Sequence, residues 1–234
     1  KSQYPIDDDR ICMRGFSMGG AATWHQATHY AGKWVAATPG AGFAETAIYQ
    51  NVAKREVQPP WWEQKLWGLY DATKVAGNLR QCSTIAYSGE NDKQMQSSDI
   101  MSEYMAKEGL ELPHIIGPGM GHAYDDGSKD EIERRLVPLV EQGKDRVPEQ
   151  IRFTTYSLRY NEMLWVQVDG LEKHWERSDV AADIVDGGIQ VKTTGITALT
   201  LNMSAGQCPF SVGAEPSVVI DGTEITGPGV SADT

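Results

Sequence analysis

Short apolar runs alternate with longer, mixed segments through the first part of the chain. Four apolar or β-branched runs, most of them closed by glycine or proline, are typical of buried strands: residues 11–14, 34–37, 84–88 and 113–116. Four segments have helical composition: residues 18–30, 44–54, 95–108 and 130–141. Strands and helices that alternate at this spacing predict an α/β fold built on a doubly wound parallel sheet.

The pattern changes near residues 143–148, after which helical segments disappear. Strand-like runs separated by short turns follow: residues 151–160, 164–168, 180–185, 189–192, 197–203 and 218–220. An Asp-Gly-Gly turn at residues 186–188 joins two of these runs and is a strong hairpin signal. We therefore expect two domains, an α/β domain over residues 1–147 and a small antiparallel β-sandwich over residues 148–234.

The first strand and the first helix meet at residues 15–20, which read Gly-Phe-Ser-Met-Gly-Gly. Strand, Gly-x-Ser-x-Gly and helix in this order form the context of a nucleophile elbow, a strained turn that lifts the serine hydroxyl above the sheet. Glycines flank the serine because a Cβ there would collide with the neighbouring strand and helix. We predict that Ser17 is the nucleophile and that the N–H of Met18, at the helix start, donates to an oxyanion.

A serine hydroxyl needs a general base, and the base needs a carboxylate that orients it. His122 follows the last apolar strand on a glycine-rich loop, which can carry its side chain over the strand end to Ser17. The loop after residues 84–88 offers Glu90 and Asp92. We favour Asp92, where the loop should bend over the sheet edge, and keep Glu90 as the alternative.

Two other histidines, His25 and His29, have the i,i+4 spacing of a helical metal site. No companion ligand is evident, so we interpret them as ordinary helix positions and expect neither a metal nor a cofactor. The aromatic segment 59–70 contains Trp61, Trp62 and Trp67. These rings could line a substrate pocket and stack on an aromatic acyl group or a sugar, or they could pack against the rest of the protein.

Four blocks in order, residues 7–11, 15–20, 88–92 and 119–122, resemble the C-terminal half of an α/β-hydrolase. The sequence is most similar to the prolyl oligopeptidase and dienelactone hydrolase branches, in which D-x-x-R-I precedes G-x-S-x-G-G. This resemblance covers roughly residues 5–142. It implies a serine hydrolase whose catalytic triad is Ser17, Asp92 and His122. The β-rich tail is more loosely similar to C-terminal modules of secreted bacterial hydrolases.

The chain departs from these families before the elbow. The resemblance implies several strands and an oxyanion loop ahead of the nucleophile, whereas about one strand precedes Ser17 here. A parallel sheet without those strands exposes an edge and an apolar face. We therefore expect either that a second copy or another chain completes the sheet or that the edge of the sheet is abnormal.

The net charge and the cysteine count limit the classes of partner and of fold that fit this chain. The net charge is −11 in 234 residues, which disfavours nucleic acid and anionic membrane as partners. Three cysteines are too few and too scattered for a disulfide framework. Two hypotheses follow: a hydrolase that cleaves an ester or peptide bond in a small-molecule, carbohydrate-linked or peptide substrate, and an inactive hydrolase fragment whose β-sandwich binds glycan or protein.

Overall fold

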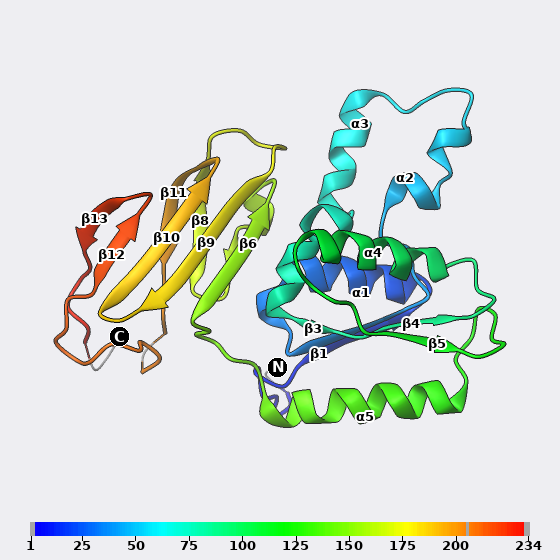
Figure 1. The fold of residues 1–234 in the computed structure, drawn as a ribbon, viewed down its shortest axis with the longest axis horizontal. Helices are drawn as coiled ribbons and strands as arrows, with labels where there is room; N and C mark the ends of the chain where they lie inside the picture. Colours follow the sequence, from blue (N-terminus) through cyan, green and yellow to red (C-terminus); the bar gives the residue numbers. More distant parts are fainter. Residues whose placement is uncertain (1–2, 205, 232–234) are drawn as a thin grey trace. The chain divides into compact units, whose positions relative to one another are not determined.

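The computed structural model describes residues 3–204 and 206–231, drawn in Figure 1. The chain divides into two compact units, Lys1–Lys144 and Asp145–Thr234. This division falls close to the boundary predicted at residue 147. Among the described residues, no helix combines the length and the apolar character that crossing a bilayer requires.

The first unit is built on a parallel sheet. Its strands are β1 (Cys12–Phe16), β2 (Ala36–Gly40), β3 (Ser83–Thr84), β4 (Ala86–Gly89) and β5 (His114–Gly117). β2 pairs with β1, β3 and β4, and β4 pairs with β5, all in parallel. β2 is buried along its whole length, whereas β1 lies at an edge and is only half-buried. Parallel pairing brings the carboxyl ends of all the strands to one edge of the sheet.

Helices cover both faces of this sheet. The longer ones are α1 (Met18–His29), α4 (Met95–Lys107) and α5 (Asp126–Gln142). Figure 1 shows α1 and α4 on one face and α5 on the other. Ile85, Tyr87 and Ile115 from the sheet pack with Ile132 of α5 in a buried apolar cluster. The predicted strand–helix alternation therefore matches this unit: each apolar run contributes to the sheet, α1 and α4 each connect two of its strands, and α5 follows its last strand.

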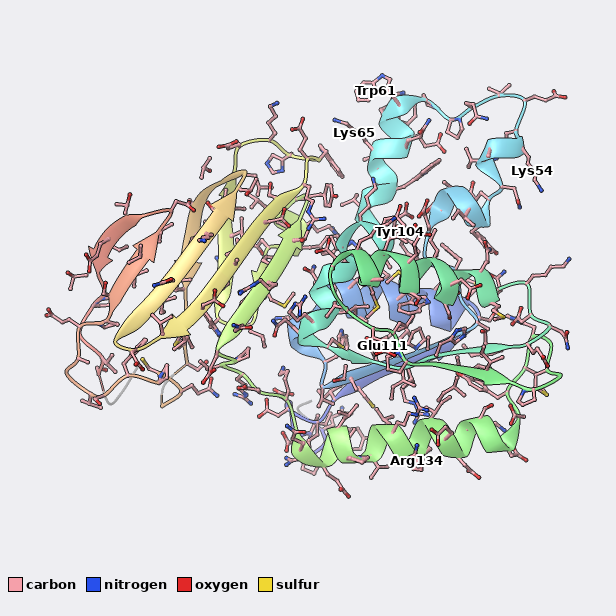
Figure 2. All side chains as sticks on the ribbon, in the orientation of Figure 1. Lys54, Trp61, Lys65, Tyr104, Glu111 and Arg134 are labelled. Atoms are coloured by element: carbon pink, nitrogen blue, oxygen red, sulfur yellow. The ribbon has the colours of Figure 1, made fainter. Side chains whose placement is uncertain are left out.

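The connection from β2 to β3 consists of short helices: α2 (Thr46–Tyr49), η2 (Val52–Lys54), α3 (Trp61–Leu66), η3 (Trp67–Leu69) and η4 (Thr73–Gln81). One helix was expected over residues 44–54, but Asn51 has a left-handed backbone, with φ of 51°, and separates α2 from η2. Figure 1 shows α2 and α3 projecting away from the sheet, and Figure 2 labels Lys54, Trp61 and Lys65 on this projection.

The second unit consists of two sheets. Its elements are β6 (Gln150–Thr155), η5 (Leu158–Tyr160), β7 (Glu162–Met163), β8 (Val166–Leu171), β9 (Ser178–Val185), β10 (Gly188–Thr194), β11 (Ile196–Leu201), β12 (Ser217–Ile220) and β13 (Thr223–Thr226). One sheet has the order β13-β12-β10-β9-β6 and the other β11-β8-β7. All neighbours run antiparallel except β10 and β12, which are parallel.

The first strand of this unit is shorter than its β-branched run predicts. A strand was expected over residues 151–160, but β6 ends at Thr155. The Thr155 hydroxyl lies 2.7 Å from the Tyr160 carbonyl oxygen and 2.9 Å from that of Ser157, so its single hydrogen is donated to one or shared between them where the chain turns into η5. A side chain that bonds to nearby backbone competes with the strand ladder and ends it here.

Candidate active site

Ser17 lies between β1 and α1 in a strained conformation. Its φ of 59° and ψ of −117° are rare for a residue with a Cβ, and such strain is concentrated at functional sites. Two hydrogen bonds hold it: the Ser17 N–H donates to the Gly40 carbonyl at 2.8 Å, and the Ala21 N–H donates to the Ser17 carbonyl at 3.0 Å. The turn is therefore fixed both to the neighbouring strand and to the helix that it opens.

Close backbone packing explains two of the three glycines around Ser17. A Cβ on Gly15 would collide with the backbone of Gly19, and one on Gly20 would collide with the carbonyl group of Gly40 in β2. The prediction is wrong for Gly19, where a Cβ would have nothing within 4 Å. The close approach to β2 is thus made one residue later than the Gly-x-Ser-x-Gly pattern suggests.

Three loops at the carboxyl edge of the sheet bring Ser17, His122 and Asp92 together. His122 Nε2 lies 2.8 Å from Ser17 Oγ, and His122 Nδ1 lies 2.8 Å from Asp92 Oδ2. The Asp92 side chain is 4% exposed, and its Oδ1 accepts the Gln94 N–H at 2.9 Å. A carboxylate fixed in this way selects the tautomer with the proton on Nδ1 and leaves Nε2 to accept the serine proton.

Glu90, the alternative carboxylate, has a different partner. Its Oε2 accepts the N–H of Gly119 at 2.7 Å, on the loop that carries His122. Two backbone bonds join the same loops, from the Glu90 N–H to the Gly117 carbonyl at 3.0 Å and from the Asn91 N–H to the Met120 carbonyl at 2.8 Å. The loop after β4, which carries Asp92, is therefore held at several points to the loop after β5, which carries His122 and is called the histidine loop below.

Aromatic side chains that the sequence analysis did not identify support the histidine loop. The ring centre of Phe16 lies 4.9 Å from that of His122 and 4.8 Å from that of Tyr124. Tyr87 stacks on Tyr124 at 4.2 Å, and its hydroxyl donates to the Ala123 carbonyl at 2.7 Å. Burial raises the pKa of Tyr87, so its hydroxyl stays protonated and keeps donating. Phe16 ends β1, just before Ser17, and Tyr87 lies in β4, just before the loop with Asp92. In the sequence, these positions are the only indication that the two rings support the histidine loop.

The Met18 N–H is placed to act as a donor. Met18 is the first residue of α1, so its N–H has no acceptor within the helix. Met18 as a whole residue is 84% exposed. The helix dipole adds partial positive charge at this position.

An open cleft of about 350 Å³ contains the three residues. Its lining residues are Ser17, Asn91, Asp92, Lys93, Gln94 and His122. The predicted pocket residues Trp61, Trp62 and Trp67 are not among them. Trp61 and Trp62 lie on α3 and are 72% and 53% exposed, while Trp67 begins η3 and is half-buried. A substrate role for these tryptophans stays a prediction.

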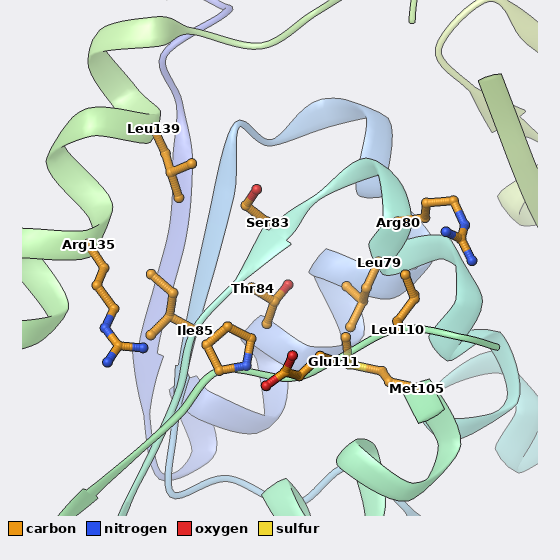
Figure 3. A pocket seen from close by; sticks show the side chains of 11 residues that line it. Leu79, Arg80, Ser83, Thr84, Ile85, Met105, Leu110, Glu111, Arg135 and Leu139 are labelled. Carbon is orange, nitrogen blue, oxygen red and sulfur yellow. The ribbon is translucent and has the colours of Figure 1, made fainter. Parts of the chain in front are cut away.

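A second cavity, of about 370 Å³, is mainly apolar and lies among η4, β3, α4 and α5 (Figure 3). Both arginines that line it are engaged: Arg135 pairs with Glu131 at 2.6 Å, and Arg80 donates to the Glu108 carbonyl at 2.7 Å. It holds none of the three hydrogen-bonded residues. The chemistry of the site therefore belongs to the smaller, polar cleft.

The histidine pair on α1 is a packing feature. His29 is 2% exposed, and its ring lies tilted against that of His25, with centres 4.6 Å apart. Burial, together with the neighbouring His25, lowers the pKa of His29 to about 4. In the described part of the chain, no three His, Cys, Asp or Glu side chains are grouped so that they could hold a metal ion.

Comparison with protein families gives one match. Residues 1–138 match the model described as the prolyl oligopeptidase family. This range includes the whole hydrogen-bonded chain from Ser17 to Asp92. Comparison with curated proteins gives no match.

Solved structures are similar to a little under three fifths of the chain. A puromycin-hydrolyzing peptidase of Mycobacterium tuberculosis is 18% identical over 59% of this chain and 22% of its own, with a TM-score of 0.48. Dipeptidyl peptidase 4 of Porphyromonas gingivalis is 20% identical over 59% of this chain and 20% of its own, at 0.46. S-formylglutathione hydrolase of Staphylococcus aureus is 20% identical over 59% and 55%, at 0.42. The chain thus spans about a fifth of the two peptidases and just over half of the hydrolase.

Proposed function

The chain belongs to the prolyl oligopeptidase family of serine hydrolases, and we propose that it cleaves an ester or peptide bond through an acyl-enzyme on Ser17. The observation that carries this proposal is the continuous hydrogen-bonded chain from Ser17 Oγ through His122 to Asp92, with 2.8 Å at each link. A nucleophile, a base and an orienting carboxylate at these distances are the arrangement that acyl transfer requires.

In the proposed reaction, Ser17 Oγ attacks the substrate carbonyl carbon while its proton moves to His122 Nε2. Asp92 accepts the Nδ1–H of the resulting imidazolium and stabilises its charge. The Met18 N–H donates to the oxyanion that forms on the carbonyl oxygen. His122 then gives its proton to the departing alcohol or amine, and a water molecule repeats the sequence on the acyl-enzyme, releasing the acid and restoring Ser17.

Hydrolysis of two substrate types tests the proposal. We expect the full chain to hydrolyse 4-nitrophenyl acetate, and the family match favours activity on peptidyl 4-nitroanilides as well. Changing Ser17→Ala or His122→Ala should lower kcat by a factor of about 10⁴–10⁶, because these residues act as one unit. Hydrolysis that persists in Ser17→Ala would overturn the assignment.

We further propose that a second copy or another chain covers the edge strand β1. Support comes from the strand order: β1 is the last strand of the sheet, pairs with β2 on one side and is only half-buried, and it directly precedes Ser17. Unpaired backbone on such an edge favours association. We expect sedimentation to detect a complex and the β1 amides to be protected from hydrogen exchange within it. A monomer at all concentrations, with fast exchange in β1, would argue against this proposal.

A further inference from the structure

The cleft beside Ser17 has an unusually polar wall. Besides the three residues of the proposed triad, it is lined by Asn91, Lys93 and Gln94, which are consecutive with Asp92 on the loop after β4. Every lining side chain therefore carries a polar or charged group. A pocket for a plain hydrocarbon acyl group is normally lined by apolar side chains, so this wall suits a polar substrate.

The charges around the cleft are not equally available to a ligand. The Asp92 carboxylate is almost fully buried and is occupied by His122 and by the Gln94 N–H. The Glu90 carboxylate is occupied by the Gly119 N–H and does not line the cleft. Both carboxylates therefore already accept hydrogen bonds from fixed donors.

Lys93 is the positively charged residue among those that line the cleft. Its side chain is exposed and lines the cleft. Within residues 3–204 and 206–231, no hydrogen bond or ion pair involves its ammonium group. A flexible ammonium group of this kind can reach an anionic ligand without first breaking an internal ion pair.

Gln94 is a second polar group in the wall of the cleft. Its Oε1 is shielded from solvent and has no hydrogen-bond partner among the described residues. A buried amide oxygen without a partner is costly, so a side-chain rotation that brings this oxygen to a ligand in the cleft would gain a hydrogen bond that it lacks here. Rotation of the carboxamide by half a turn offers its NH₂ instead, so Gln94 can donate to an anionic group as well as accept from a neutral one.

From these contacts we infer that the cleft takes acidic substrates, in which a carboxylate near the scissile carbonyl is bound by Lys93 with Gln94 beside it. This inference rests on the proposed hydrolase function and names its substrate class. The charge acts locally, because ions screen the remaining negative charges of the protein beyond about 8 Å at physiological ionic strength.

A pair of esters with equal acyl length tests the inference. Mono-4-nitrophenyl glutarate ends in a carboxylate and 4-nitrophenyl valerate ends in a methyl group. The measured quantity is the ratio of their kcat/KM values, after the spontaneous hydrolysis of each ester at the same pH has been subtracted. We expect Lys93→Met to lower this ratio about tenfold and Lys93→Glu to lower it further, as for a unit charge about 6 Å away in a partly aqueous cleft. Added salt should lower the wild-type ratio and leave that of Lys93→Met unchanged.

The matched control is Lys107→Met, which removes the same charge from α4 at a lysine paired with Glu103. It should leave the ratio within twofold of wild type. An equal ratio in wild type and Lys93→Met would overturn the inference even though both esters are hydrolysed, whereas hydrolysis of neither ester would count against the proposed function.

Binding measured without turnover separates a failure of this inference from a failure of the proposed function. Glutarate is titrated into the full chain while the His122 ring signals are followed by NMR, with valerate as the neutral comparison. We expect glutarate to bind about tenfold more weakly to Lys93→Met than to wild type. Equal affinity of the two proteins for glutarate would overturn the inference whether or not the esters are hydrolysed.

Discussion

Gly19 and Gly20 are adjacent glycines of α1 for which the structure predicts opposite effects of alanine. A Cβ on Gly20 would lie 2.9 Å from the carbonyl carbon of Gly40 and 3.0 Å from the nitrogen of Gly42, where ordinary contacts are 3.4–4 Å. The obstacle is backbone, which has no rotamer to change, so α1 and β2 must move apart. Overpacking costs about 1–3 kcal/mol, and we expect Gly20→Ala to lie at the upper end, about 3 kcal/mol.

Gly19→Ala is the matched control. A Cβ at Gly19 has nothing within 4 Å, and the backbone there is helical. Alanine favours the helix over glycine, so we expect a gain of about 0.5 kcal/mol. The two variants should then differ by about 3.5 kcal/mol in the free energy of unfolding, which corresponds to roughly 7–14 °C in Tm for a chain of this size.

Scanning calorimetry of the full chain measures this difference in the transition of the first unit. We expect Gly20→Ala to melt well below wild type and Gly19→Ala to melt at or slightly above it. Melting of the two variants within 2 °C of each other would refute the close packing of α1 on β2 that positions Ser17.

Three further predictions follow from buried or clamped groups. Burial and the neighbouring His25 lower the pKa of His29 to about 4 from 6.5, so the unfolded state takes up the proton first as pH falls. Stability should therefore drop by about 3 kcal/mol between pH 6.5 and pH 4, and His29→Gln should flatten this dependence in urea titrations. Burial raises the pKa of Cys82 to about 12, so a thiol reagent at pH 8 should modify the other two cysteines and reach Cys82 only after denaturation. Glu90→Ala removes the acceptor for the Gly119 N–H and should lower kcat about tenfold with little change in KM. Glu90→Gln keeps an acceptor, so its kcat should stay within threefold of wild type. Equal kcat in both variants would contradict the view that this hydrogen bond holds the loop that carries His122.

Much of the first unit could be predicted because its signals are local. Strand–helix alternation fixes a parallel sheet, and the carboxyl ends of parallel strands meet at one edge, so Ser17, Asp92 and His122 could be placed together from their positions after strands. Choosing between Glu90 and Asp92 rested on where the loop bends. Their different partners depend on the hydrogen bonds of the histidine loop, which are contacts between distant segments.

The rest depends on contacts that sequence patterns do not encode. The strand expected over residues 151–160 stops at Thr155 because of that side chain's own hydrogen bonds. The helix expected over residues 44–54 is split by a left-handed Asn51. Gly19 was assigned a packing role that the structure gives to Gly20, because the motif defines the turn and leaves open which glycine approaches β2.

The central claim is that Ser17 is an activated nucleophile, and covalent labelling tests it most directly. The full chain is incubated with a fluorophosphonate, which loses fluoride when a serine oxygen attacks phosphorus, and the adduct is located by mass spectrometry of peptides. We predict one adduct per chain, on Ser17, formed much faster than in His122→Ala, and no adduct in Ser17→Ala. An adduct on another residue, or equal labelling of Ser17→Ala, would contradict the account.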